Sequence, residues 1–414
     1  MGWYLGIDIG KRFHVACLAD AEGKEVGVPL TFNADREGFL KLESFLKTAA
    51  GDGGLGSVKA GMEATGHYWL SLYLYLQERG LDVSVLNPLE VKAFRNEGIR
   101  GNKTDAVDAV KISKLLRFGD FREAYVPDGD MAALRQLTRL RGDLVETLTS
   151  FKHKATAVLD QLFPEYGKLF SDAFGVTSRA LLSEASTPEA IAALPAKRLT
   201  AVLRAASRGR FGEEKAREVQ TVARGTVGRT GKGTDMFAAG LEVILSEVDH
   251  LQEKIDGLDK LIAASMEVVP TTLTTIPGIG TTLAAVILAE IGDASRFFGN
   301  KDGAEKLVAL AGLDPKLRSS GQFQGKTKMS KRGSPYLRHA LHTASFVAVF
   351  TAKDPLFRGI YEKHREKGKH PEVAISHVSR KMTHVIFSLL KNNTPYDPEG
   401  GNRRQAKREV VSET

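Results

Sequence analysis

The chain has 414 residues, 42% of them hydrophobic, which fits two or three globular domains better than one compact core. There are 58 lysines and arginines against 50 aspartates and glutamates, so the net charge of +8 favours an anionic partner without identifying it. The single cysteine, Cys17, lies in an apolar run; it excludes a disulfide framework or cysteine-based zinc site, and we expect a buried, inert thiol.

The first residues predict a sheet. Residues 3–32 contain three short β-rich runs separated by turn signals, typical of an antiparallel meander. A helix is expected over 36–49, a strand over 57–63, a helix over 68–79 and a strand over 82–87. Three strands followed by alternating helix and strand is the order of a ribonuclease-H-like α/β domain.

Two later segments repeat apolar residues at alternating steps of three and four, which predicts two long helices. The seams are Leu134, Leu137, Leu144, Leu148, Phe151, Val158 and Leu162, then Phe237, Leu241, Ile244, Val248, Leu251, Ile255, Leu258 and Ile262. The two helices either pack on a core or form a coiled coil, within the chain or between protomers. Between them, 165–235 predicts short helices ending in a glycine-rich loop, where Gly231-Lys232 lacks the spacing of a phosphate-binding loop.

Four carboxylates stand out. Asp8 and Glu63 lie in apolar strands, where an ionised group is costly to bury without a cationic partner. Asp105 and Asp108 are three apart on a predicted helix and share a face; each alone is more typical of a solvated helix residue. Together the four could hold two Mg²⁺ ions that polarise a phosphodiester. Lys103 either contacts phosphate or pairs with an aspartate.

A kinase is a competing interpretation of the first strand, because GIDIGK suits the phosphate-binding hairpin of sugar and acetate kinases. Those folds repeat the hairpin in a second half and need a glycine-rich adenosine loop. We find neither feature in this sequence.

The C-terminal half is basic. Residues 274–293 predict a helix-hairpin-helix, whose Gly278 and Gly280 let backbone N–H groups approach a DNA phosphate; the alternative is a tight turn without a ligand. The stretch 316–338 has seven cations and no acidic residue, which indicates a nucleic-acid face. These cations are Lys316, Arg318, Lys326, Lys328, Lys331, Arg332 and Arg338. Ser319-Ser320-Gly321 lies among them, and a loop of this kind is usually only structural.

Six motifs, GIDIGK, GMEATGHYW, GNKTDAVDA, IPGIGTTLAAVILAEIGD, LVALAGLDP and SSGQFQGKTKMSKRGSPYLRHAL, together resemble the DEDD transposases of the insertion-sequence "one-ten" family. The resemblance implies a RuvC-like N-terminal domain whose Mg²⁺ ligands fall on Asp8, Glu63, Asp105 and Asp108. It also implies a nucleophilic serine at Ser320, although Ser319 directly precedes it.

The same resemblance implies the partners. Such proteins pair donor and target DNA through a non-coding bridge RNA, as homodimers or homotetramers in which a serine of one protomer joins the carboxylates of another. The phosphoserine link to DNA is transient. The resemblance also implies a bacterial, nucleoid-associated protein. A cytoplasmic location is expected from the sequence itself, since no apolar run approaches the ~20 residues that span a bilayer and no signal pattern is present.

We therefore expect an α/β plus all-α protein of four parts. These are a RuvC-like domain over 1–125, a coiled-coil region over 126–268 with a helical insertion at 165–235, a transposase domain over 269–395, and a disordered tail over 396–414. The expected function is Mg²⁺-dependent, RNA-guided DNA recombination. The alternatives are a two-metal nuclease or junction resolvase that uses water, and a non-enzymatic helix-hairpin-helix DNA binder.

Overall fold

The computed structural model divides the chain into two compact units, Met1–Pro127 and Asp128–Thr414, which are described separately. No helix in the described part of the chain is both long and apolar enough to cross a membrane. The described residues are 2–50, 55–64, 66–88, 91, 94, 104–121, 123–229, 231, 233–316, 319–320, 323–324 and 328–399, with no account of the side chains of residues 50, 319–320 and 323–324.

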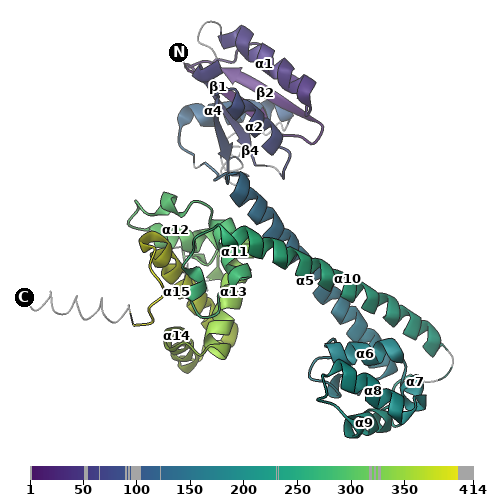
Figure 1. Ribbon diagram of the computed structural model, residues 1–414. Helices are drawn as coiled ribbons and strands as arrows, with labels where there is room; N and C mark the ends of the chain where they lie inside the picture. The colour runs from purple at the N-terminus through teal and green to yellow at the C-terminus, as the bar shows by residue number, and fades with distance from the viewer. Residues whose placement is uncertain are drawn as a thin grey trace, which may run out of the picture. The chain divides into compact units, whose positions relative to one another are not determined.

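The first unit is built on a five-stranded sheet with the order β3-β2-β1-β4-β5 (Figure 1). The central strand β1 is antiparallel to β2 and parallel to β4; β2 and β3 are antiparallel, and β4 and β5 are parallel. This confirms a mixed α/β N-terminal sheet. The strands are β1 (Trp3–Asp8), β2 (Phe13–Ala19), β3 (Leu30–Asn33), β4 (Val58–Glu63) and β5 (Asp82–Leu86).

Helices cover both faces of this sheet. On one face, α1 (Arg36–Ala50) and α2 (Leu70–Glu78) bury their apolar stripes against β1 and β4 in a shared core. On the other face lies α4 (Asp105–Phe118), whose Ala109 packs on β2. Cys17 is buried in that second core, and burial raises the pKa of its thiol to about 11, as expected for an inert group.

The second unit begins with two long helices, α5 (Gly129–Leu162) and α10 (Thr234–Glu267), which pair antiparallel within the chain. The start of α5 shares a core with the end of α10, their middles form a second core, and the end of α5 meets the start of α10 in a third. The predicted seams are therefore an intrachain pair. Thr138 and Leu245 are buried beside the expected Leu137 and Ile244, because a straight helix drifts from a seven-residue repeat.

The segment between these helices folds as a small helical bundle. Its core gathers around Tyr166, whose hydroxyl lies 2.7 Å from the Ser178 hydroxyl, and it includes the adjoining ends of α5 and α10. The sequence predicted short helices here without assigning them a common core. They are η3 (Tyr166–Lys168), α6 (Val176–Glu184), α7 (Pro188–Ala193), α8 (Ala196–Ala206) and α9 (Glu213–Arg224).

The C-terminal part is mostly helical, as expected. Three of its helices begin with a polar residue followed by proline. The side chains of Ser334, Asp354 and His370 accept backbone N–H groups in the first turn. Proline suits the next position because the N–H that it lacks would have no partner within the helix. The helical elements are η4 (Leu273–Thr275), α11 (Thr281–Ile291), η5 (Ala294–Phe297), α12 (Gly303–Leu310), α13 (Pro335–Phe346), the π-turn η6 (Val347–Thr351), α14 (Pro355–Glu366) and α15 (Pro371–Asn392).

Four two-residue strands follow α12: β6 (Pro315–Lys316), β7 (Ser319–Ser320), β8 (Phe323–Gln324) and β9 (Lys328–Met329). After α15 the chain returns to the core, where the Tyr396 backbone N–H donates to the Thr275 hydroxyl at 2.9 Å and its own hydroxyl donates to Asp354 at 3.1 Å. The rest of the predicted tail, 400–414, lies outside the described residues.

Candidate active site

Two of the four predicted carboxylates end neighbouring parallel strands. Ile7 of β1 pairs with Met62 of β4, so the next residue on each strand places Asp8 beside Glu63. Both are half-buried. The carboxyl ends of parallel strands are where open α/β sheets place their ligands.

The glycines two residues before them show which face these carboxylates occupy. A Cβ on Gly6 would lie 2.1 Å from the Ala109 carbonyl oxygen, and one on Gly61 would lie 2.7 Å from Leu116, so both glycines face α4 at close range. Side chains alternate along a strand. Asp8 and Glu63 therefore face the same side of the sheet as α4.

The other two carboxylates lie in the first turn of α4. The Thr104 hydroxyl accepts the Val107 N–H at 3.3 Å and caps the helix, and acidic groups are favoured at this positive end of the helix dipole. Asp108 is only 4% exposed, whereas Asp105 is exposed to solvent. The solvated-edge interpretation thus suits Asp105 and does not suit Asp108.

The strand ends and the helix start are neighbours. Asp8 pairs with Val15 of β2, and Val15 packs in one apolar cluster with Ala106 and Ala109 of α4. Asp8 thus lies next to the turn that carries Asp108. The fold thus places Asp8 and Glu63 side by side and on the face of the sheet that α4 covers, although they lie far from α4 in the sequence.

These carboxylates suit Mg²⁺ by chemistry. Among the residues that the structure describes, no three acidic, histidine or cysteine side chains form a ready metal cluster. Magnesium does not require one, because it keeps several waters and is usually bound by one or two carboxylates together with substrate phosphates. An open site between the strand ends and α4 fits that coordination better than a closed protein cage.

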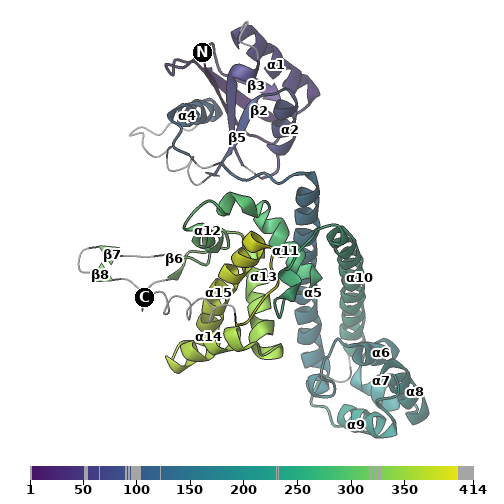
Figure 2. The same ribbon diagram turned by 60° about the vertical axis from the view of Figure 1, so that its left-hand side comes forward.

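The predicted serine loop is a narrow β-arm. The strands β6 and β9 pair antiparallel near α12, and β7 and β8 pair antiparallel further out (Figure 2). The backbone of Ser320 pairs with that of Phe323, and the backbone of Ser319 pairs with that of Gln324.

Two lysines face each other across the β6–β9 pair of the arm. Lys316 pairs directly with Lys328, and both are exposed. Like charges opposite one another destabilise an antiparallel pair, so an anion near this position would relieve the repulsion. Lys331 and Arg332, just beyond β9, are also exposed. The arm therefore presents four cations suited to phosphate.

The remaining predicted nucleic-acid contacts divide into two groups. Arg338 is half-buried and donates to the Ala311 carbonyl at 3.0 Å, so it closes the end of α12. Lys103, Arg318 and Lys326 lie outside the described residues.

The glycine turn before α11 has one packed and one open glycine. Gly278 has φ of +94°, and a Cβ there would lie 2.5 Å from the Ala344 carbonyl oxygen, so it is required for packing on α13. Gly280 is the exposed N-cap of α11 with nothing within 4 Å of a Cβ, so only its side of the turn is open to a phosphate. The element before the turn is the single 3₁₀ turn η4.

A buried carboxylate that the sequence analysis missed links α5, α11 and the start of α13. Glu290 of α11 is 4% exposed; it accepts two bonds from Arg139 of α5, at 2.6 and 2.9 Å, and one from the Ser334 hydroxyl at 2.8 Å. Burial opposes its ionisation, but the Arg139 bonds outweigh this and lower the pKa of Glu290. Its only sequence signal is a lone acid in an apolar helix.

Comparison with known protein families finds a match for each of the two segments that carry candidate site residues. Residues 5–164 match a DEDD transposase model of the IS110 type, and residues 271–362 match a model described as transposase, IS116/IS110/IS902 family. The chain belongs to the IS110 family of transposases. The carboxylate set falls in the first matched segment and the β-arm in the second.

Full-length relatives of this IS110-family chain agree. It is 25% identical over 407 residues to an uncharacterized 42 kDa protein of insertion element IS900 from Mycobacterium paratuberculosis, covering 95% of this chain and 97% of the relative. It is 26% identical to a putative IS117 transposase of Streptomyces coelicolor (96% and 95% covered). It is 24% identical to a pilin gene-inverting protein of Moraxella bovis (95% and 97% covered).

Proposed function

We propose that this IS110-family protein is a Mg²⁺-dependent DNA recombinase that cleaves and rejoins strands through Ser320, guided by a non-coding bridge RNA. The observation that carries the proposal is the placement of Asp8 and Glu63 at adjacent strand ends, facing the helix start that bears buried Asp108. The strand order, with one antiparallel strand beside the centre, supports a ribonuclease-H-like or RuvC-like first domain.

The carboxylates and the serine have separate roles in this proposal. Asp8, Glu63, Asp105 and Asp108 hold Mg²⁺, which supplies polarisation of a DNA phosphate. The Ser320 oxygen attacks that phosphorus, forming a serine–phosphate ester as the bond to a DNA oxygen breaks and that oxygen takes up a proton. One ester replaces another, so the freed DNA hydroxyl of a second strand can reverse the step without an energy source.

The DNA and the RNA would be held by cationic side chains. Lys316, Lys328, Lys331 and Arg332 on and beside the arm provide phosphate contacts, and the facing lysine pair supports an anion there. Gly280 would let a phosphate approach the start of α11, as in a helix-hairpin-helix. Donor DNA, target DNA, the bridge RNA and further copies of the chain, as homodimer or homotetramer, are the proposed partners.

The nucleophile is tested by substitution. With supercoiled donor and target DNA and the cognate RNA, Ser320→Ala is expected to abolish recombination and the protein–DNA adduct seen on a denaturing gel. Ser319→Ala is the matched control, because it removes the neighbouring hydroxyl from the same strand and should leave both signals. Recombination by the Ser320→Ala protein would overturn the assignment. Cleavage to free hydroxyl ends without an adduct would instead indicate a two-metal nuclease that uses water.

A further inference from the structure

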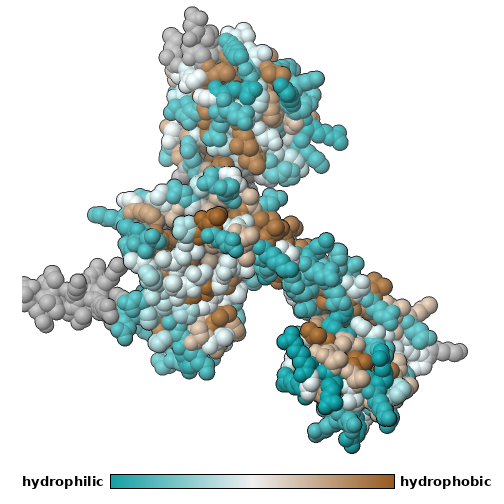
Figure 3. Space-filling view, viewed as in Figure 1, coloured by the Kyte–Doolittle hydropathy of each residue, from teal (hydrophilic) through white to brown (hydrophobic). Residues whose placement is uncertain are grey.

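The helical hairpin of α14 and α15 carries charge that the candidate active site does not use. Residues 355–391 contain eight lysines and arginines against three glutamates, together with four of the ten histidines. The whole chain has 58 against 50, so cations are concentrated in this hairpin. Hydrophilic side chains gather over the α14 edge of the molecule (Figure 3).

These cations surround a pair of stacked histidines. His364 of α14 lies flat on His377 of α15, with ring centroids 3.8 Å apart and planes 1° apart. Burial lowers the pKa of His364, and so do Lys367, Lys363 and Lys369. The lysines of α14 and of the following turn therefore lie near the stacked histidine pair.

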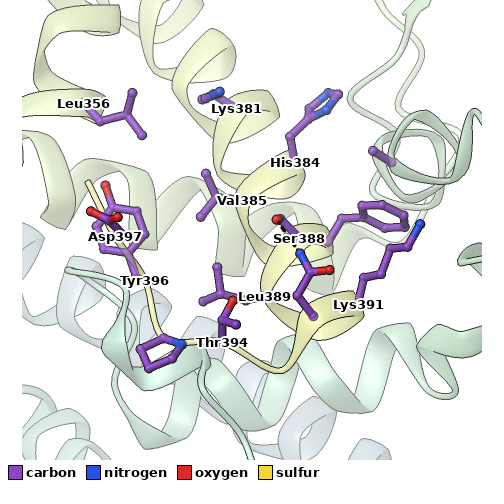
Figure 4. A pocket seen from close by; sticks show the side chains of 14 residues that line it. Leu356, Lys381, His384, Val385, Ser388, Leu389, Lys391, Thr394, Tyr396 and Asp397 are labelled. Carbon is purple, nitrogen blue, oxygen red and sulfur yellow. Dashed lines mark hydrogen bonds between the residues drawn. The ribbon is translucent and has the colours of Figure 1, made fainter. Parts of the chain in front are cut away.

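A polar stripe continues this charge along α15. Its members recur every three or four residues on one helix face: His377, Lys381, His384, Ser388 and Lys391. At 1.5 Å per residue the stripe is about 21 Å long. Its second half borders a pocket of about 660 Å³, and Lys381, His384 and Lys391 project from α15 at its rim (Figure 4).

Neutralisation of this surface within the chain is incomplete. Glu305 of α12 pairs with Arg380 at 2.7 Å and with His384 at 3.4 Å, and Asp397 adds an acid at the far side of the pocket. In the described part of the chain, Lys367, Lys369 and Lys381 have no ion-pair partner. Three exposed ammonium groups therefore remain for an external anion.

We propose that this face, the α14–α15 basic surface (Lys363, Lys367, Lys369, Lys381 and the α15 stripe), binds the phosphate backbone of duplex DNA away from the β-arm. Lysines spread over two packed helices, with polar side chains between them, can contact a duplex backbone without reading its bases. The identity of the partner as DNA rests on the proposed function. The surface adds a second site of attachment to that of the arm.

Duplex DNA is favoured over single strands because the pocket offers no free aromatic ring for an unpaired base. Tyr396 stacks on Phe357 with ring centroids 5.9 Å apart, and its hydroxyl is bonded to Asp354. Phe387 packs edge-on against Phe298, also at 5.9 Å. Single-strand binding proteins rely on exposed aromatic platforms in addition to positive charge.

The test measures how binding of the full chain to a 30-base-pair duplex depends on salt, by fluorescence anisotropy. The variant Lys367→Ala/Lys369→Ala/Lys381→Ala should bind at least about tenfold more weakly near 0.1 M salt, and the slope of log affinity against log salt should fall by roughly 0.9 for each DNA phosphate that the variant no longer neutralises. The arginine triple variant at the same positions should retain wild-type binding, which separates charge from folding.

A matched control removes three exposed lysines from other helices of the same unit, as Lys197→Ala/Lys254→Ala/Lys260→Ala, and should leave affinity and slope near wild type. An equal loss of DNA affinity in both triple-alanine variants would overturn the proposed DNA-binding surface. So would an unchanged salt slope in the Lys367→Ala/Lys369→Ala/Lys381→Ala variant. A loss confined to a single-stranded or RNA probe of equal length would overturn the assignment to duplex DNA. If the wild-type protein binds duplex DNA through this surface but does not recombine DNA, the proposed function would be contradicted and the DNA-binding surface would stand.

Discussion

At the scale of single residues, the two aspartates of α4 have different surroundings. Asp108 is 4% exposed and faces the sheet that carries Asp8, whereas Asp105, one turn earlier, is exposed. From the sequence the two were equivalent, because a spacing of three identifies a shared face but not which end of it meets the sheet. The burial of Asp108 separates them.

Asp108→Asn is accordingly expected to reduce Mg²⁺-dependent strand transfer by about 100-fold or more, since losing a metal ligand costs at least as much as losing a residue that supports one. Asp105→Asn should cost less than about tenfold. Strand-transfer rates across a Mg²⁺ titration measure both, and the Asp108 variant should also need more metal. An equally large loss in the Asp105 variant would show that the exposed Asp105 contributes as much to holding the ion as the buried Asp108.

At the scale of elements, periodicity predicted the strands of the sheet, α5 and α10, because each repeats its apolar residues with its own period. Other features were beyond prediction. The Arg139–Glu290 pair joins residues 151 positions apart, and no local pattern encodes such a meeting. Gly278 was assigned to phosphate approach, although its role in the structure is to fit against the Ala344 carbonyl.

The bonds to Glu290 tie α5, α11 and the start of α13 together. Glu290→Gln leaves Arg139 without its carboxylate partner and should lower the free energy of unfolding by roughly 2 kcal/mol. This loss is smaller than that for breaking a fully buried ion pair, because Arg139 is partly exposed to solvent. Urea unfolding measures the loss. Glu305→Gln, which removes a more exposed ion pair with Arg380, should cost less than about 0.5 kcal/mol.

The pH dependence of the same group provides a further measurement. The pKa of Glu290 is lower in the folded protein than its ordinary value, so its stabilisation is complete above the unfolded pKa and is lost as the pH falls through the folded pKa. The difference in stability between wild type and Glu290→Gln should therefore shrink as the pH falls below about 4.5. A constant difference down to about pH 3 would contradict the ion pair.

At the scale of the whole molecule, the first unit contains complete cores. All members of the apolar clusters around β1, β4 and α4 fall before Pro127. The second unit has its own three cores along α5 and α10. Composition alone predicted more than one domain, and the mixed sheet followed by helices confirms the broad fold class. The common core of α6–α9 required tertiary packing that the sequence does not reveal.

A fragment comprising residues 1–127 is therefore expected to unfold in one cooperative thermal transition. A fragment that ends at residue 103 should not, because it lacks α4 and exposes the sheet face that Ala109, Ile112 and Leu116 cover. Circular dichroism and calorimetry of the two fragments distinguish these outcomes. Cooperative unfolding of the shorter fragment would show that α4 is dispensable for the core.

The two glycines under α4 have a consequence for how loss of function arises. Gly6 and Gly61 contribute no side-chain donor, acceptor or charge to the candidate site, yet the absence of their side chains sets how near α4 comes to the sheet. A single added methyl group at Gly6 would push the helix that bears Asp108 outward from the strand that bears Asp8. The geometry of the candidate site thus depends on the absence of side-chain atoms at Gly6 and Gly61 as much as on its carboxylates.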